Sequence, residues 1–201
     1  MYLAGYNALQ ILLWLICGVS MLAAVMAERP TEAFARVNRL YRYVQSLMVL
    51  DVVHNLVGLT RGKPVMTALQ ISSRVFIVWT VTPLFDFTPM HAVMYMAWTL
   101  TELIRYSYYL LKDKDIHWLV WSRYSSFLIL YPLGVFVGEV PLIVKAGLAA
   151  PTGSIRRILC SFALCTYLPG FPALFRYMLR QRRTALTRLR ATSDTLASTG
   201  H

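Results

Sequence analysis

The chain of 201 residues is 57% hydrophobic and only 14% charged, with a mean hydropathy of +0.53. An average soluble domain has about 45–50% apolar and about 25% charged residues, so this composition excludes an ordinary soluble domain, and its hydrophobicity excludes a disordered chain. Three cysteines without a CxxC pair predict neither a disulfide framework nor a zinc site. We therefore interpret the sequence as a membrane protein that crosses the bilayer several times.

Six segments approach the length of about 20 mostly apolar residues that a transmembrane helix needs. In chain order they are residues 6–27, 40–60, 65–81, 90–111, 116–140 and 155–179. The fifth contains Pro132, and the sixth contains Pro169 and Pro172, where we expect it to be kinked or broken. The predicted fold is an all-α membrane protein, a single bundle of six transmembrane helices over residues 1–179, followed by a basic tail over residues 180–201.

The net charge of +11 bears on orientation and partners. Six spans place both termini on one side, which holds nine basic residues against seven on the other, so the positive-inside rule places both termini in the cytosol. The nine are Arg61, Lys63, Lys112, Lys114, Arg180, Arg182, Arg183, Arg188 and Arg190. A basic tail beside a span is typical of attraction to anionic lipid headgroups. Nucleic-acid binding is the other interpretation, and the lack of base-reading motifs in the tail argues against it.

Ionisable residues inside the predicted spans are informative, because each costs roughly 2.5–3.5 kcal/mol at a helix centre and should face the bundle interior. They are Asp51, His54, Arg74, Glu102, Arg105, Arg123 and Glu139. With His54 neutral, three acids balance three arginines, which favours a paired interior network over an ion-conducting pore. Glu102 and Arg105 lie three apart, with Tyr106 on the same flank. For Arg74 and Arg123, helix pairing and the binding of an anionic group both stay open.

The fifth segment combines residue types that suit chemistry. Tyr131, Pro132, Gly134, Gly138 and Glu139 fall within nine positions. The proline leaves a backbone carbonyl unpaired, and the glycines allow another backbone or a ligand to approach closely. A buried carboxylate near a tyrosine hydroxyl is a candidate acid/base pair. The alternative is a kinked helix with a hydrogen-bonded tyrosine and a glutamate at the water interface.

Blocks of residues in the same order along all six segments resemble the very-long-chain 3-hydroxyacyl-CoA dehydratases, a family once labelled protein-tyrosine-phosphatase-like. The blocks are Tyr2, Tyr6, Gln10 and Trp14; His54 and Gly58; Thr67, Gln70, Ser73, Arg74 and Trp79; 98–102 and 104–106; Trp121, Arg123 and Tyr124; Tyr131, Pro132 and Gly134; 169–172; and 180–183.

This resemblance implies an endoplasmic-reticulum enzyme of fatty-acid elongation that removes water from a 3-hydroxyacyl-CoA to give a trans-2-enoyl-CoA. It implies no metal and no other cofactor, and it implies the other elongation enzymes as partners. Tyr131 and Glu139 match the catalytic pair, Glu139 taking the C2 proton and Tyr131 acting on the C3 hydroxyl. The predicted substrate-binding or site-supporting residues are Arg74, Glu102, Arg105, Tyr106, Arg123, Tyr124 and Gly134.

One departure concerns this pair. The family pattern has seven positions from tyrosine to glutamate, whereas Tyr131 and Glu139 are eight apart. On an ideal helix seven residues bring two side chains within about 20° of each other, and eight leave them about 80° apart. A single-turn bulge among residues 135–137 would absorb the extra residue.

The candidates for binding the CoA phosphates are the basic residues Lys112, Lys114, Arg180, Arg182 and Arg183. The alternative is that these residues are ordinary solvated surface charges.

Three other functions are weighed against the dehydratase. A cysteine phosphatase needs an arginine six positions after its cysteine, and here those positions hold Ala23, Thr166 and Phe171. A small transporter would explain broken helices with buried charges, although no internal repeat supports it. A catalytically weak relative that scaffolds elongation enzymes would explain the longer Tyr131–Glu139 spacing.

Overall fold

The computed structural model describes residues 1–60, 62–114 and 116–199, and over these residues all regular structure is helical. Arg61 and Asp115, which belong to two predicted turns, lie outside the described residues, as do the last two residues of the predicted tail. The all-α fold predicted from the sequence is confirmed.

The helices of the described chain group into six consecutive runs. They are α1 (Tyr2–Met26); α2 (Pro30–Leu47) with α3 (Val49–Leu56); α4 (Pro64–Phe76) with the π-helix η1 (Ile77–Val81) and the 3-10 helix η2 (Thr82–Leu84); α5 (Pro89–Leu111) with η3 (Lys112–Lys114); α6 (His117–Ser125), α7 (Phe127–Pro132), the π-helix η4 (Leu133–Glu139) and α8 (Val140–Leu148); and α9 (Ile155–Thr199).

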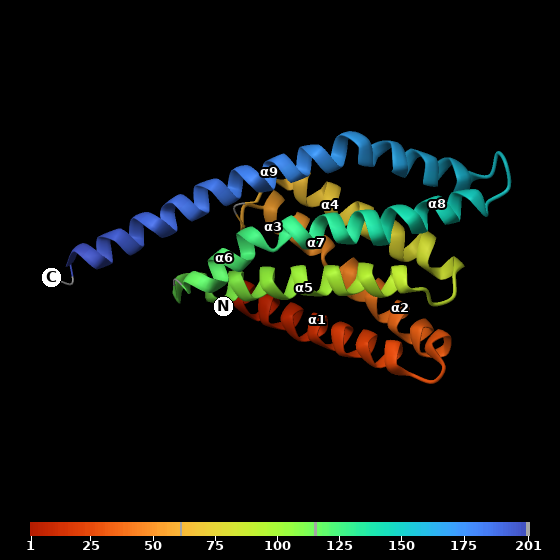
Figure 1. Cartoon of the computed structure of the whole chain (residues 1–201), viewed down its shortest axis with the longest axis horizontal. Helices are drawn as coiled ribbons and strands as arrows, with labels where there is room; N and C mark the ends of the chain where they lie inside the picture. Colours follow the sequence, from red (N-terminus) through yellow and green to blue (C-terminus); the bar gives the residue numbers. More distant parts are fainter. Residues whose placement is uncertain (61, 115, 200–201) are drawn as a thin grey trace.

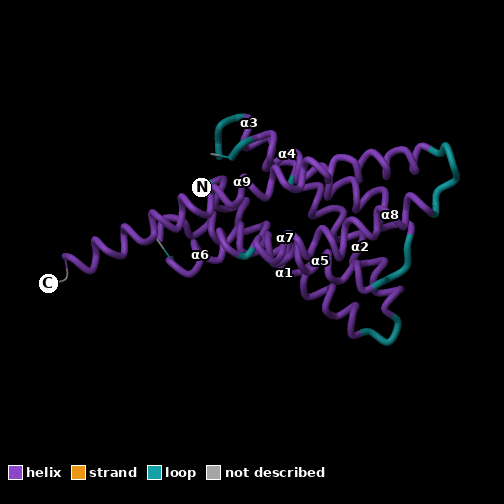
Figure 2. Tube along the Cα trace, turned by 45° about the horizontal axis from the view of Figure 1, so that its top comes forward, coloured by secondary structure: helices purple, strands orange, loops and turns teal. Residues whose placement is uncertain are grey.

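The runs lie side by side along the long axis of the molecule, and both termini are at the same end (Figure 1). Short loops join them, as the teal segments in Figure 2 show. α5 is central, since it packs against α1 on one side and against α6, α7 and η4 on the other. α9 covers α8 and α6 and also touches α4.

Four of the six runs are long and apolar enough to cross a membrane: Tyr2–Met26, Pro64–Leu84, His117–Leu148 and Ile155–Leu189. The outward face of α1 is a stripe of exposed apolar side chains that water would not solvate well, including Leu9, Leu12, Ile16 and Val19. The chain is therefore a membrane-embedded protein. The remaining two runs, α2–α3 and α5, overlap predicted spans but are not among these four.

The second run begins at Pro30, ten residues before the predicted start of that span. Proline suits the first turn of a helix, where its missing N–H would have no partner in any case. The buried face of α2 is formed by Phe34, Val37, Tyr41 and Val44, at helical spacing. The sequence prediction passed over residues 30–39 because Glu32, Arg36 and Arg39 interrupt their hydrophobic pattern.

The sixth run decides between the two outcomes expected at its prolines, a kink or a break. α9 is not broken at Pro169 or Pro172 but continues as a single helix from Ile155 to Thr199, arching over the bundle (Figure 1). A bend accommodates the backbone bonds that the two prolines remove. The predicted tail from residue 180 is a direct extension of this helix, and it projects beyond the other helices (Figure 1).

The π-helix η4 packs on α5, and its two glycines differ in how closely they approach that helix. A Cβ atom at Gly138 would lie 2.5 Å from the Met94 Cβ and 3.0 Å from its Cα. A Cβ at Gly134 would lie 3.5 Å from the Ala97 Cβ and 3.9 Å from Trp98. Gly138 is therefore a site of close backbone approach, as predicted, whereas Gly134 has room for a methyl group.

Replacing Gly138 by alanine should push η4 away from α5. We expect a loss of about 1–3 kcal/mol in unfolding free energy, the usual cost of overpacking a close contact. Thermal unfolding of the detergent-solubilised protein measures it. Gly5→Ala in α1 is the matched control, since a Cβ there meets nothing within 4 Å. Equal melting temperatures for the two variants would contradict the tight packing.

Candidate active site

The π-helix η4 solves the spacing problem in the fifth segment. It begins directly after Pro132 and ends at Glu139, two residues before Pro141. A π-helix closes its hydrogen bonds over one more residue than an α-helix, so it takes up one extra position. Tyr131 and Glu139, eight residues apart, consequently line the same cavity. The bulge expected from the sequence is confirmed, and it spans Leu133–Glu139.

The cavity lies between α4, the α7–η4 segment and α9, and it has about 430 Å³ of empty space, part of which is open to the outside. Part of its wall is apolar, formed by Leu69, Val135, Phe171 and Leu174. Its main polar groups come from all three helices: Gln70, Ser73, Arg74, Tyr131, Glu139 and Tyr167. An apolar slot with a few convergent polar groups is the usual form of a small-molecule site.

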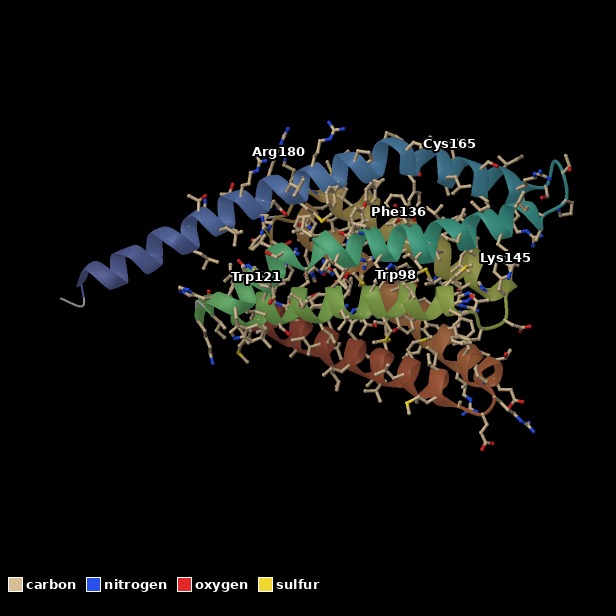
Figure 3. The ribbon with its side chains drawn as sticks, in the orientation of Figure 1. Trp98, Trp121, Phe136, Lys145, Cys165 and Arg180 are labelled. Carbon is tan, nitrogen blue, oxygen red and sulfur yellow. The ribbon has the colours of Figure 1, made fainter. Side chains whose placement is uncertain are left out.

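Glu139 is held by both of its carboxylate oxygens. The side chain is 5% exposed, and its Oε1 accepts a hydrogen bond of 2.8 Å from Nε1 of Trp98 on α5. Its Oε2 accepts a hydrogen bond from the hydroxyl of Tyr167 on α9. Figure 3 shows Trp98 near the middle of the bundle, between α5 and the segment that carries Glu139. A carboxylate fixed in this way is oriented for one position in the cavity.

Tyr131 is positioned by its ring rather than by its hydroxyl. The ring stacks on Phe171 of α9 with centroids 4.8 Å apart and an interplanar angle of 7°. Phe171 stacks in turn on Phe175, with centroids 5.7 Å apart. Among the described residues the Tyr131 hydroxyl has no hydrogen-bond partner. It is therefore available to a molecule in the cavity.

A buried ionic network anchors Arg74 at the cavity wall. Its Nη1 lies 2.5 Å from Oε1 of Glu102, whose Oε2 lies 2.5 Å from Nε of Arg105. Arg105 also reaches Asp51 at 2.6 Å, and the Tyr106 hydroxyl donates to the same carboxylate at 2.7 Å. Two acids and two arginines thus neutralise each other away from water, which is how buried charges are tolerated. The paired network predicted from the sequence exists for these four residues.

Two members of the predicted network lie outside it. Glu139 pairs with neutral donors, and the Arg123 guanidinium lies over the rings of Tyr109 and Tyr124, 5.9 and 5.8 Å from their centroids. The sequence predicts equal numbers of buried acids and arginines. Which of them form ion pairs depends on which helix faces are in contact. His54 is distant from the cavity, and its Nε2 hydrogen-bonds to the Tyr2 hydroxyl at 2.9 Å.

The nine predicted site residues therefore fall into three groups. Tyr131, Glu139 and Arg74 line the cavity. Behind Arg74, the ionic network contains Glu102, Arg105 and Tyr106. The third group lies off the cavity wall: Gly134 packs on α5, and Arg123 and Tyr124 contact each other on α6.

Sequence reasoning missed Tyr167, which contacts Glu139 directly. The available signal was a tyrosine in an otherwise apolar span, immediately before the 168–172 stretch that contains both prolines. Trp98 stood among the residues of the resemblance, but its hydrogen bond to Glu139 could not be inferred. The Arg74 guanidinium also lies 5.2 Å from the centroid of the Trp98 ring, so Trp98 contacts both charged groups of the cavity.

Fold and site together define a helical membrane protein with a carboxylate, a phenol and an arginine around one internal cavity. Comparison with known proteins identifies the family. A family model described as "Protein tyrosine phosphatase-like protein, PTPLA" matches residues 45–188, and the chain belongs to this family. No solved structure matches the chain.

Curated relatives cover nearly the whole chain. A protein of Schizosaccharomyces pombe named "Probable very-long-chain (3R)-3-hydroxyacyl-CoA dehydratase" is 35% identical, with 90% of this chain and 91% of that protein aligned. The mouse "Very-long-chain (3R)-3-hydroxyacyl-CoA dehydratase 1" is 32% identical over 92% of this chain and 73% of its own. The rice protein "Very-long-chain (3R)-3-hydroxyacyl-CoA dehydratase PASTICCINO 2B" is 32% identical over 95% of both chains.

Removing Glu102 should destabilise the bundle strongly. Glu102→Ala leaves Arg74 and Arg105 buried without their shared partner, and breaking a buried pair typically costs about 3–5 kcal/mol. Thermal unfolding in detergent would show a large drop in melting temperature. Glu32→Ala is the control, because the Arg29–Glu32 pair is exposed and such pairs contribute about 0.2–1 kcal/mol. Similar losses in both variants would contradict the role of the buried network.

Proposed function

We propose that this chain is a dehydratase that removes water from long-chain 3-hydroxyacyl-CoA thioesters to give trans-2-enoyl-CoA. The observation that carries the proposal is a buried, doubly hydrogen-bonded carboxylate and an unpaired phenol in one partly apolar cavity. Family membership supports the same reaction, since the relatives are named as dehydratases of these substrates.

Three of the polar groups of the cavity suit the three parts of the reaction. Glu139 takes the proton from C2, which the thioester makes acidic, and the electrons left behind form the C2–C3 double bond. Tyr131 gives its hydroxyl proton to the oxygen on C3, which leaves as water. Arg74 supplies positive charge near the thioester carbonyl, where negative charge develops in the transition state. Proton exchange through the cavity returns the base and the acid to their starting forms.

The geometry of the pair supports this division of roles. Glu139 keeps a fixed orientation through Trp98 and Tyr167, as a base aimed at one carbon requires. Tyr131 keeps its ring plane through Phe171 while its hydroxyl stays available to the substrate. The apolar part of the wall suits an acyl chain, which already partitions into the membrane.

The finer cellular assignments belong to the same proposal. They are a location in the endoplasmic-reticulum membrane, six membrane crossings with both termini in the cytosol, a basic cytosolic segment over residues 180–201 and the other elongation enzymes as partners. The positions of both termini at one end of the bundle (Figure 1) support an even number of crossings. Labelling of tagged termini in intact microsomes tests the topology, and labelling of one terminus only would exclude it.

Replacing either catalytic residue should abolish most turnover. With a long-chain 3-hydroxyacyl-CoA and purified protein in detergent, we expect Glu139→Gln and Tyr131→Phe to lower kcat by about 10²–10⁴-fold, the usual contribution of general acid–base catalysis. Tyr43→Phe is the control, since Tyr43 is 68% exposed on α2. Undiminished turnover in Tyr131→Phe would remove the phenol from the mechanism. No turnover in folded wild-type protein would favour the scaffold.

Tyr167 should act as a positioning residue for Glu139. Tyr167→Phe removes one hydrogen bond to the carboxylate and keeps the ring, and hydrogen bonds to charged groups contribute about 1.5–3 kcal/mol. We expect kcat to fall about 10- to 100-fold with little change in KM. An unchanged kcat would show that the contact is structural only.

A further inference from the structure

A second hollow lies at the end of the bundle that holds both termini. It is formed by Lys63 at the start of α4, Tyr124 on α6, and Tyr177, Arg180 and Arg188 on α9, and it encloses about 760 Å³, part of it open to solvent. Three of its lining side chains are basic, and none of the described residues that line it is acidic. Figure 3 shows Arg180 on α9 toward the end that carries the termini, with Lys145 at the other end of the molecule.

The same three helical runs line this hollow and the catalytic cavity in matching order. On the α4 run Lys63 precedes Arg74, and on the α6–η4 run Tyr124 precedes Tyr131. On α9, which runs in the opposite direction, Arg180 follows Tyr167. The axial offsets along these runs are about 16, 10 and 20 Å at 1.5 Å per residue. The hollow and the cavity therefore lie at two successive positions along the same three helical runs, which define one direction, or path, from the first to the second.

The chemistry of the hollow matches a phosphorylated nucleotide. Lysine and arginine bind phosphate oxygens through charge-assisted hydrogen bonds, and tyrosine rings offer a face on which a base can stack. The Lys63 ammonium lies 5.4 Å from the centroid of the Tyr177 ring, and Gln181 Nε2 donates to the Tyr177 hydroxyl at 2.9 Å. The Tyr177 ring in the wall of the hollow thus lies beside a positive charge.

We propose that this hollow binds the adenosine bisphosphate end of the CoA thioester, with the pantetheine arm extended along the path to place the reacting carbons between Tyr131 and Glu139. This inference rests on the proposed dehydratase function. It explains how a highly charged cofactor moiety can remain at the end of the bundle while its thioester reacts deep inside the His117–Leu148 run.

The hollow also reduces the set of five basic residues that the sequence suggested as candidates for binding the CoA phosphates. Of these only Arg180 lines it. Arg182 turns toward α6, where its Nε donates to the Ser125 hydroxyl at 3.3 Å. Lys63 was not among these five candidates, because its position beside α9 depends on tertiary packing and not on the local sequence.

Removing the two positive charges tests the site directly. The double variant Lys63→Gln/Arg180→Gln is compared with Arg183→Gln, whose side chain is exposed on α9 and does not line the hollow. Calorimetry measures the affinity for adenosine 3′,5′-bisphosphate. We expect the double variant to bind at least 10-fold more weakly than the wild type, and Arg183→Gln to bind equally well. Equal affinity in all three proteins, or no binding to the wild type, would overturn the proposal.

Kinetics separates this inference from the proposed reaction. With 3-hydroxyacyl-CoA, the double variant should raise KM about 10-fold or more with little change in kcat. With the matching 3-hydroxyacyl-pantetheine thioester, which lacks the nucleotide, its kcat/KM should equal that of the wild type. Turnover of both thioesters without any KM difference would overturn the nucleotide site and leave the dehydratase intact. Failure of the wild type to turn over either thioester would instead contradict the dehydratase.

Anionic lipid is the other source of phosphate at this end of the bundle. Binding of the three proteins to vesicles with and without phosphatidylserine distinguishes it. Vesicle binding that does not differ between the double variant and Arg183→Gln, together with the loss of nucleotide affinity, supports the nucleotide. A loss of vesicle binding with unchanged nucleotide affinity would assign the charges to a lipid headgroup and overturn the proposal.

Discussion

The close contact between η4 and α5 is the constraint on which the site depends. Gly138 lets the π-helix approach Met94, and this approach brings the Glu139 carboxylate within 2.8 Å of the Trp98 indole. The π-helix itself lies between Pro132, the last residue of α7, and Pro141, in the first turn of α8. A larger residue at position 138 would separate the carboxylate from its partners on α5, and the cavity would lose its fixed base.

The central position of α5 explains how a helix with so many polar side chains can be buried in the bundle. Its Glu102 and Arg105 meet Arg74 and Asp51 from two other helices, so each charge has a partner of opposite sign within 2.6 Å. Neighbouring helices cover the faces that carry these groups, and lipid meets the exposed apolar side chains of α1 and α9 instead. Breaking one pair leaves an uncompensated charge, whereas the complete set is neutral.

Glu139 and Tyr131, the two groups that we propose to react, are held in different ways. The carboxylate of Glu139 is fixed through its oxygens by Trp98 and Tyr167, which leaves little freedom for its plane. The phenol of Tyr131 is fixed through its ring by Phe171, which leaves the hydroxyl free to follow a leaving oxygen. This difference is what an elimination needs, because the base must meet one C–H bond while the acid accompanies a departing group.

Much of the fold and some of the site followed from the sequence alone. Hydropathy gave the membrane class and the six helical runs, since the length and apolarity of a segment are local properties. The Glu102–Arg105 pair followed from i,i+3 spacing on one helix, and the eight-residue Tyr131–Glu139 spacing already required a bulge. Only the tertiary structure decided the contacts of Glu139 with Trp98 and Tyr167, which are 41 and 28 residues distant in the chain. It also decided that Arg123 meets tyrosine rings and that α9 passes unbroken through two prolines. These features depend on the rotation and bending of whole helices against one another, which no local pattern of residues specifies.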